Sequence, residues 1–287
     1  MDGGPPVGET AAVVGMTITG TDAFQEDSAG DPHPSAPSAD KHSKERDMST
    51  YLLVHGAWHS GQCWERVVPF LTSAGHRVLA PSLTGHGDKA HLLSPEVGLD
   101  THVDDIVTLI TEEDLTEVVL VGHSYAGLVI SSAANRAPDR IAHLVYLDAM
   151  VPEDGESAAD VMPLTQGMID LAAKSDGGWR VPPPELPPSS GLFGVTDPVD
   201  VAWLRTMLSD QSVRCFQQPV RLDNPAVNGI PRTHIHCVAG VPKGYERRSV
   251  PAIQPNGSPA QVWELPTGHD CMITLPGELA ELLLKLG

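Results

Sequence analysis

The sequence predicts an α/β fold in which a mostly parallel sheet is flanked by helices. Three features predict it. Short apolar runs typical of buried strands recur through residues 48–287, and those before residue 118 are each followed by a helix or by a loop and a helix. The run 118–121 ends in Gly-His-Ser-Tyr-Ala-Gly and continues as a helix. The last run is followed by a glycine and a histidine, His269.

Strands and helices alternate in the first half of the chain. The helices at 62–74 and 99–113 are predicted from apolar residues that recur at helical spacing. The inner face of the first helix carries Trp64, Val67, Val68 and Leu71. In chain order, the elements are a strand at 51–54, the helix at 62–74, a strand at 77–81, the helix at 99–113, a strand at 118–121, a helix from 128 onward, strands at 141–147, 233–238 and 260–265, and a terminal helix at 275–286.

Ser124 stands at the tip of the turn that joins the strand 118–121 to its helix. Such a strand–turn–helix arrangement is typical of a nucleophile elbow, in which the serine takes a strained backbone and small residues must flank it. Here the fifth position of G-x-S-x-G is Ala126, which is small, and Gly127 follows it. The pattern predicts that the Ser124 hydroxyl projects from the sheet edge as a nucleophile.

The first strand runs into His55-Gly56-Ala57-Trp58, a loop that is typical of an oxyanion hole in this kind of sheet. The amide of Ala57 is predicted to join the amide of Tyr125 in holding the developing negative charge. His55 and His59 are four positions apart, a spacing that metal ligands also use. Because a glycine lies between them and no third ligand is near in sequence, we expect a loop and no metal.

His269 is the candidate base among thirteen histidines. It follows the last predicted strand, and parallel strands bring their carboxyl ends to one sheet edge, which is also the edge of Ser124. His123 lies inside the elbow and is expected to point away from the site. His234 and His236 lie within a strand.

Composition limits the kinds of partner and compartment. The formal net charge of −19 argues against binding to nucleic acid and to anionic membrane surfaces. No apolar run approaches the roughly 20 residues that span a bilayer. The four cysteines show no C-x-x-C or other paired spacing, so free thiols in a reducing, cytoplasmic compartment are expected. The oligomeric state stays open.

The chain is expected to divide into three parts. Residues 1–47 are rich in Gly, Pro, Ser, Asp and Ala and are predicted to be a disordered extension. Residues 48–150 and 233–287 form the α/β core. Residues 151–232 contain helical pieces separated by prolines and are predicted to be an inserted lid. The candidate substrate-binding residues are Trp58, Met150, Phe193 and Trp203.

In combination and in order, these motifs resemble the α/β-hydrolase superfamily. The resemblance is strongest to the small branch that contains plant methylesterases, hydroxynitrile lyases and many bacterial esterases. It covers roughly residues 50–287 through His55–Trp58, Gly122–Gly127 and Gly268-His269. The resemblance implies the α/β-hydrolase fold with a helical lid and a serine–histidine pair, but it says little about substrate.

The same resemblance implies a carboxylate that orients His269. In the plant-like branch this acid follows the strand that here ends at Cys237, where the sequence 237–244 has no carboxylate. Other members of the superfamily place the acid one strand earlier, and Asp148 occupies that place. We therefore assign Asp148, with Glu246 as the second candidate. The alternative role for Asp148 is to cap a helix of the lid.

The function expected from these residues is hydrolysis of a small carboxylic ester, with a methyl or aryl group, through a covalent acyl-enzyme. Ser124 attacks, His269 transfers the proton and Asp148 holds the imidazole. Neither a metal nor an organic cofactor is needed. The expected partner is a small apolar or aromatic substrate.

Two other functions stay open. The chain also resembles bacterial hydrolases of methyl carbamates such as benzimidazole carbamates of the carbendazim type, whose carbonyl the same residues can attack. Some proteins of this fold are receptors for small ligands and have lost part of the catalytic set. The presence of both Ser124 and His269 disfavours that third function.

Overall fold

The computed structural model describes residues 48–175, 177–184, 191–240 and 247–287. The extension 1–47, which the sequence predicts to be disordered, lies outside the described residues. Glu246, the second candidate for the carboxylate that orients His269, lies outside them too.

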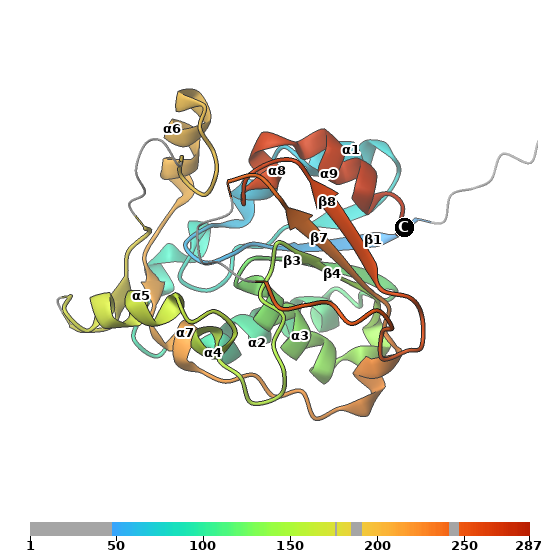
Figure 1. Ribbon diagram of the computed structural model, residues 1–287, viewed down its shortest axis with the longest axis horizontal. Coiled ribbons are helices and arrows are strands. Elements are labelled where there is room, and N and C mark those ends of the chain that lie inside the picture. Colours follow the sequence, from blue (N-terminus) through green and yellow to red (C-terminus); the bar gives the residue numbers. More distant parts are fainter. Residues whose placement is uncertain (1–47, 176, 185–190, 241–246) are drawn as a thin grey trace, which may run out of the picture. The chain divides into compact units, whose positions relative to one another are not determined.

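Within the described residues, six strands form one sheet in the order β2-β1-β3-β4-β7-β8 (Figure 1). Every neighbouring pair in this sheet is parallel, as predicted. The strands are β1 Thr50–Val54, β2 Arg77–Leu79, β3 Val118–His123, β4 Ile141–Leu147, β7 Arg232–Cys237 and β8 Gln261–Leu265.

The two faces of the sheet pack into separate apolar cores. In β1, Leu52 and Val54 point into one core, whereas Tyr51 and Leu53 point into the other, because successive side chains of a strand face opposite sides. All four are fully buried. A strand that is buried on both faces has no polar alternation, which is why these strands read as continuous apolar runs.

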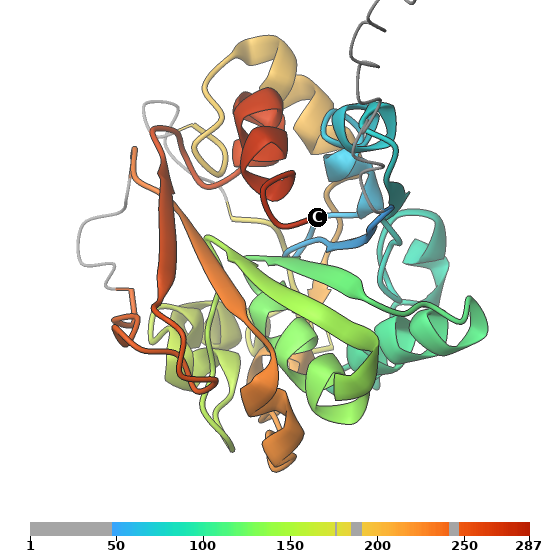
Figure 2. The same ribbon diagram turned by 90° about the vertical axis from the view of Figure 1, so that its right-hand side faces the viewer.

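Helices cover both faces (Figures 1 and 2). On one face lie α2, Leu99–Glu112, and α3, Ala126–Arg136. On the other lie α1, Val68–Ser73, α8, Cys271–Thr274, and α9, Pro276–Leu283. Among the described residues, none of the helices combines the length and apolar character needed to cross a lipid bilayer.

Two predicted helices differ from the observed ones at prolines. The predicted helix 62–74 is a 3₁₀ turn, η1 Gly61–Trp64, followed by the separate helix α1. Pro69 has no amide hydrogen to continue the helical ladder across this point, so the chain must restart there. The terminal helix begins earlier than predicted, as α8, and restarts as α9 at Pro276. Trp64, Val67 and Leu71 nevertheless face inward as expected.

Residues 151–232, which we call the insertion, connect β4 to β7. They hold a short antiparallel sheet and several small helices. These elements are α4 Ala158–Val161, α5 Thr165–Ala172, β5 Arg180–Val181, α6 Pro198–Met207, β6 Gln211–Ser212, α7 Arg214–Gln217 and the 3₁₀ helix η5 Pro225–Gly229. The 3₁₀ helices η2, Gly87–Leu92, and η3, Pro138–Arg140, lie outside the insertion.

Several histidines are packed inside this fold. Burial, which disfavours the charged form, lowers the pKa of His86 and His123 to about 3. It lowers the pKa of His102, His143 and His234 to about 4. These side chains therefore stay neutral in the folded protein at pH values at which the same side chains of the unfolded chain are protonated.

We expect the free energy of unfolding to fall as the pH decreases from 7 to 5. The unfolded chain binds protons near the ordinary histidine pKa of about 6.5, whereas the folded chain does not bind them until lower pH. Each such histidine lowers the free energy of unfolding by up to about 1.4 kcal/mol for each unit by which the pH falls in this window. Urea unfolding at pH 7, 6 and 5 measures the effect.

The variant His143→Gln should flatten this pH dependence, because it removes one buried neutral imidazole on β4. The matched control is His91→Gln, since His91 is exposed. A stability that does not change between pH 7 and 5 would contradict the assignment of neutral buried histidines.

Candidate active site

The predicted chemical groups meet at the carboxyl-terminal edge of the sheet. Ser124 directly follows β3, Asp148 directly follows β4, and His269 lies in the loop after β8. The loop that begins with His55 follows β1. Because all these strands run in parallel, the sheet brings segments more than 200 positions apart in the chain to one edge (Figure 1).

Ser124 has a left-handed backbone, with φ of 56°. Three hydrogen bonds stabilise this turn: the Ser124 amide donates to the carbonyl of Leu147, and the Ser124 carbonyl accepts from the amides of Gly127 and Met150. The turn also needs small neighbours. A β-carbon on Gly122 would lie 2.8 Å from a carbonyl oxygen of α3, and one on Gly127 would overlap the carbonyl of Met150. The geometry is that of the predicted elbow.

The loop after β1 lies directly against the elbow. A β-carbon on Gly56 would lie 2.9 Å from the Ser124 β-carbon. His55 Nδ1 donates to the Gly56 carbonyl at 2.8 Å. Among the described residues, no group accepts a hydrogen bond from the amide of Ala57 or of Tyr125. Both predicted oxyanion-hole donors are thus unpaired beside the serine.

Asp148 and His269 form a short hydrogen bond at this edge. His269 Nδ1 donates to Asp148 Oδ2 at 2.6 Å. The His269 side chain is 29% exposed and that of Asp148 is 5% exposed. Asp148 Oδ1 accepts from Arg247 Nη2 at 2.7 Å and from the Cys237 amide at 3.2 Å. The alternative role of Asp148 as a helix cap is wrong, because α4, the first helix after it, is capped by Ser157.

Burial and charge act in opposite directions on this pair. Burial alone would raise the pKa of Asp148, but the hydrogen bond and charge of His269, together with Arg247, hold it well below its usual range. Burial alone would lower the pKa of His269, but the hydrogen bond and charge of Asp148, with a contribution from Asp270, raise it. Asp148 is therefore ionised, and His269 binds a proton more readily than an ordinary histidine.

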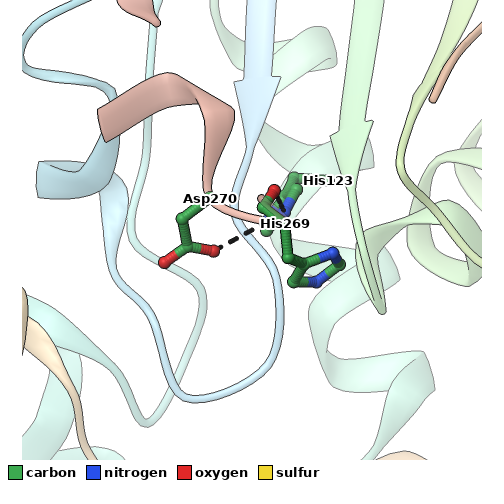
Figure 3. Close-up of side chains that lie close together, drawn as sticks. All are labelled: His123, His269 and Asp270. Carbon is green, nitrogen blue, oxygen red and sulfur yellow. Dashed lines mark hydrogen bonds and ion pairs between the residues drawn. The ribbon is translucent and has the colours of Figure 1, made fainter. Parts of the chain in front are cut away.

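His123 does not point away from the site, in contrast to its prediction. Its ring lies 4.5 Å from the ring of His269, and its Nε2 donates to the His269 carbonyl at 3.1 Å. Figure 3 shows the side chains of His269 and Asp270 leaving their loop in different directions, with the Asp270 carboxylate nearer to His123. The His123 Nε2 lies 3.8 Å from Asp270 Oδ1. His123 therefore supports the loop of His269.

Ligand atoms of His123, His269 and Asp270 lie within 4.8 Å of one another, close enough to suggest a metal site. The donor set does not fit one. His123 Nε2 carries the proton that it donates to a carbonyl, so it has no lone pair for a cation. The other nitrogen, Nδ1, faces the backbone of Gly56, where even a β-carbon would lie only 3.0 Å away.

Three of the four candidate substrate-binding residues lie around these groups. The Phe193 ring lies 4.9 Å from the ring of His59 and 6.4 Å from that of His269, and the Trp58 ring lies 5.8 Å from that of Phe193. The amide of Met150 donates to the Ser124 carbonyl. The cation–π contact of the fourth candidate, Trp203, is with another residue.

Trp203 lies on α6 and packs under the guanidinium of Arg66 at 4.5 Å. Arg66 Nη2 also donates to Asp200 Oδ1 at 2.6 Å, on the same helix. In the described part of the chain, no hydrogen bond or ring contact joins Trp203 to Ser124 or His269.

Three polar residues of this edge were not predicted from the sequence. Arg247 binds Asp148 across 99 positions, and no sequence pattern near it signals this contact. His59 and Asp270 pair at 2.9 Å and are almost completely buried, at 2% and 0% exposed. A signal for that pair did exist. A histidine four positions after His55 and an acid directly after His269 occupy loops that the sheet was already predicted to bring together.

The insertion is attached to the loop of His269 by backbone contacts. A β-carbon on Gly268 would lie 2.5 Å from the Cα of Gly194, and the converse is also true. The Asp270 amide donates to the Phe193 carbonyl at 3.0 Å. Only two glycines allow the backbones to approach this closely.

Comparisons with known proteins show the family to which the chain belongs. The sequence profile of the Alpha/beta hydrolase family matches residues 51–282. The chain is 37% identical over 248 residues to a carbendazim hydrolyzing esterase from Nocardioides sp. (strain SG-4G), which covers 84% of this chain and 100% of that protein. It is 35% identical over 121 residues to Methylesterase 2 from Arabidopsis thaliana, which covers 42% of this chain and 46% of the methylesterase. An extracellular alpha/beta-hydrolase from a Paenibacillus species has a TM-score of 0.68 at 24% identity, over 83% of this chain and 99% of that one.

We expect Gly268→Ala to reduce the free energy of unfolding by about 1–3 kcal/mol, because the new methyl group would overpack the contact with Gly194. Urea unfolding followed by tryptophan fluorescence measures the change. The matched control is Gly229→Ala, since a β-carbon there meets nothing within 4 Å. If Gly268→Ala and Gly229→Ala are equally stable, Gly194 and Gly268 are not in contact.

Proposed function

This chain belongs to the α/β-hydrolase family and is a hydrolytic enzyme, and we propose that it cleaves small carboxylic esters with Ser124 as the nucleophile. The 2.6 Å hydrogen bond between Asp148 and His269, at the same sheet edge as a left-handed Ser124, is the observation that carries the proposal. In the proposed site, this hydrogen bond orients His269 as the base for the Ser124 hydroxyl.

In the proposed first step, His269 Nε2 takes the Ser124 proton as Oγ attacks the substrate carbonyl. Asp148 keeps the Nδ1 proton in place and stabilises the imidazolium that forms. The negative charge that develops on the carbonyl oxygen is held by the amides of Ala57 and Tyr125, which are unpaired in the described chain. Each such donor is worth about 10²–10³ in rate.

Collapse of the tetrahedral intermediate then breaks the bond to the leaving alcohol, which receives its proton from His269. The acyl group stays on Ser124 until water attacks the same carbonyl. His269 removes the proton of that water and returns a proton to Ser124 Oγ as the acid is released. The cycle uses only side chains and backbone amides of this chain.

The proposed substrate is small and apolar or aromatic. Trp58, Phe193 and Met150 are the proposed substrate-binding residues, because they gather around Ser124 and His269. For Trp203 we propose a different role, in which its stacking with Arg66 fixes α6. We propose that the insertion acts as the cap over this edge.

Methyl carbamates are the second candidate substrates. The observation that favours them is the match to a carbendazim hydrolyzing esterase over that protein's whole length. A carbamate carbonyl is less electrophilic than that of an ester, but attack by Ser124 and release of methanol would proceed through the same steps.

A test of the proposal combines active-site labelling with two matched substrates. A fluorophosphonate should label Ser124 with a stoichiometry of about one, and Ser124→Ala should abolish both labelling and turnover. Methyl phenylacetate and methyl phenylcarbamate differ only by CH₂ and NH beside the carbonyl, so their kcat/KM values compare ester with carbamate directly. We expect both to be cleaved and the ester to be faster.

Failure of labelling together with failure of turnover would refute a serine hydrolase and favour the small-ligand receptor. A carbamate that is cleaved faster than its matched ester would make carbamates the preferred class.

We expect Asp148→Asn to reduce kcat by about 10³–10⁴-fold, because the amide cannot hold His269 in the same tautomer or stabilise its charged form. The side-chain oxygen that accepts from the Cys237 amide is kept, so the variant should remain folded by circular dichroism. Glu246→Gln is the matched control and should retain activity. If Glu246→Gln abolishes turnover while Asp148→Asn does not, the assignment of the acid is wrong.

We also propose that the protein works in a reducing, cytoplasmic compartment. The four cysteines are free and buried, which supports this location.

A further inference from the structure

We propose that His59 and Asp270 form a second, buried imidazolium–carboxylate pair. This pair holds the loop after β1, which carries the Ala57 amide, in register with the loop of His269. The two residues act as positioning residues for the reaction, so this inference rests on the proposed function. Their pairing joins the loop after β1 to the loop after β8, and each of these loops carries one part of the proposed machinery.

With Asp270 ionised, the hydrogen bonds of His59 place a proton on each ring nitrogen. Nδ1 lies 2.8 Å from the carbonyl oxygen of Ala57, and Nε2 lies 2.9 Å from Asp270 Oδ2. A carbonyl and a carboxylate only accept hydrogen bonds, so the ring must donate to both. His59 is then a cation, and its charge is matched by Asp270.

Asp270 is ionised in this arrangement. Burial alone would raise its pKa, but the charge of His59 and the hydrogen bond from it lower the pKa. An unpaired carboxylate at a fully buried position would be very costly, whereas a hydrogen-bonded partner of opposite charge offsets much of that cost.

The contrast with His55 supports the assignment. His55 Nδ1 donates to the Gly56 carbonyl, but its Nε2 accepts a hydrogen bond from the Leu83 amide at 3.0 Å. That ring is therefore neutral, and burial lowers its pKa well below the ordinary value. His55 and His59 lie in the same loop, but His55 carries one ring proton and His59 carries two, because their hydrogen-bond partners differ.

On one side, the pair fixes the peptide unit that follows Ala57. His59 holds the carbonyl of this unit, and its amide hydrogen, that of Trp58, donates to Gln211 Oε1 at 3.1 Å. The preceding peptide unit has its carbonyl held by His55. That preceding unit contains the Ala57 amide, so hydrogen bonds to His55 and His59 restrain the two successive peptide planes on either side of the Ala57 α-carbon.

On the other side, the pair anchors the loop of the base. Asp270 directly follows His269, its amide donates to Phe193, and its carbonyl begins α8 by accepting from Ile273. Loss of the pair would free both loops at once. Misplacement of a reacting group by about 1 Å costs about 10²-fold in rate.

Asp270 also contributes to the charge around His269. The charged and titratable groups that face this base are Asp148, Arg247, His123, Asp270 and the thiol of Cys237. The charges of Asp148 and Asp270 favour the protonated form of His269, whereas the charge of Arg247 disfavours it. Asp270 Oδ1 has no hydrogen-bond partner among the described residues, although His123 Nε2 lies 3.8 Å away, and His59 bonds the other carboxylate oxygen.

The first test measures protons directly on the folded wild-type protein. Nitrogen-15 NMR of the His59 ring at pH 8 should show two protonated nitrogens, whereas His55 should show one. A single ring proton on His59 would overturn the imidazolium, whether or not the protein hydrolyses esters.

The second test uses the variants Asp270→Asn and His59→Gln, their combination, and His143→Gln as a control for loss of a buried histidine. Turnover of p-nitrophenyl acetate should fall by about 10–10²-fold in kcat for each single variant, with KM within about twofold, because positioning and not binding is lost. The double variant should be no slower than the slower single variant, since both remove one interaction.

The pH profile separates this role from a merely structural one. In Asp270→Asn, the acid limb of kcat/KM should move to lower pH by about 0.5–1 unit, because His269 loses one of the carboxylates that raise its pKa. His143→Gln should leave kcat and the acid limb unchanged.

Folded variants that keep the wild-type kcat and acid limb would overturn the inference, and so would additive losses in the double variant. If the variants do not fold, the NMR result on the wild type decides. If the wild type shows neither turnover nor fluorophosphonate labelling, the proposed function has failed, and the proton count of His59 still tests the pair.

Discussion

The left-handed backbone of Ser124 is the constraint on which the rest of the site depends. A non-glycine residue in this conformation costs about 1–2 kcal/mol, so its surroundings must hold it there. They do so with hydrogen bonds to the chain after β4 and with glycines at 56, 122 and 127 that leave room for the turn. The loop after β1 and the loop of Asp148 are thus both positioned by contact with Ser124.

The histidines of this edge share a physical role. Irregular loops that are buried have carbonyl groups without a partner in the sheet, and such groups need donors. His55 donates to Gly56, His59 to Ala57, and His123 to His269. A ring nitrogen can donate without adding charge, as His55 and His123 do, or with charge when a carboxylate lies on the far side, as for His59. The histidine-rich composition of the chain is partly explained by this need.

Much of the site could be predicted because it follows from parallel strands. The order of strands and loops was enough to bring Ser124 and His269 to one edge, and the resemblance to the α/β-hydrolase superfamily added Asp148. The position of His123, the pairing of His59 with Asp270 and the contact of Arg247 with Asp148 depend on which way side chains turn, and strand order carries no such information. The helix predicted at 62–74 is interrupted near Pro69. The prediction did not include this break because the apolar residues keep helical spacing across the proline.

The contact between Gly194 and Gly268 has a consequence for movement of the insertion. No side chain separates the two peptide backbones at this point, so the insertion cannot move closer to the loop of His269 without displacing that loop. A displacement of the insertion in that direction is therefore expected to shift His269 directly.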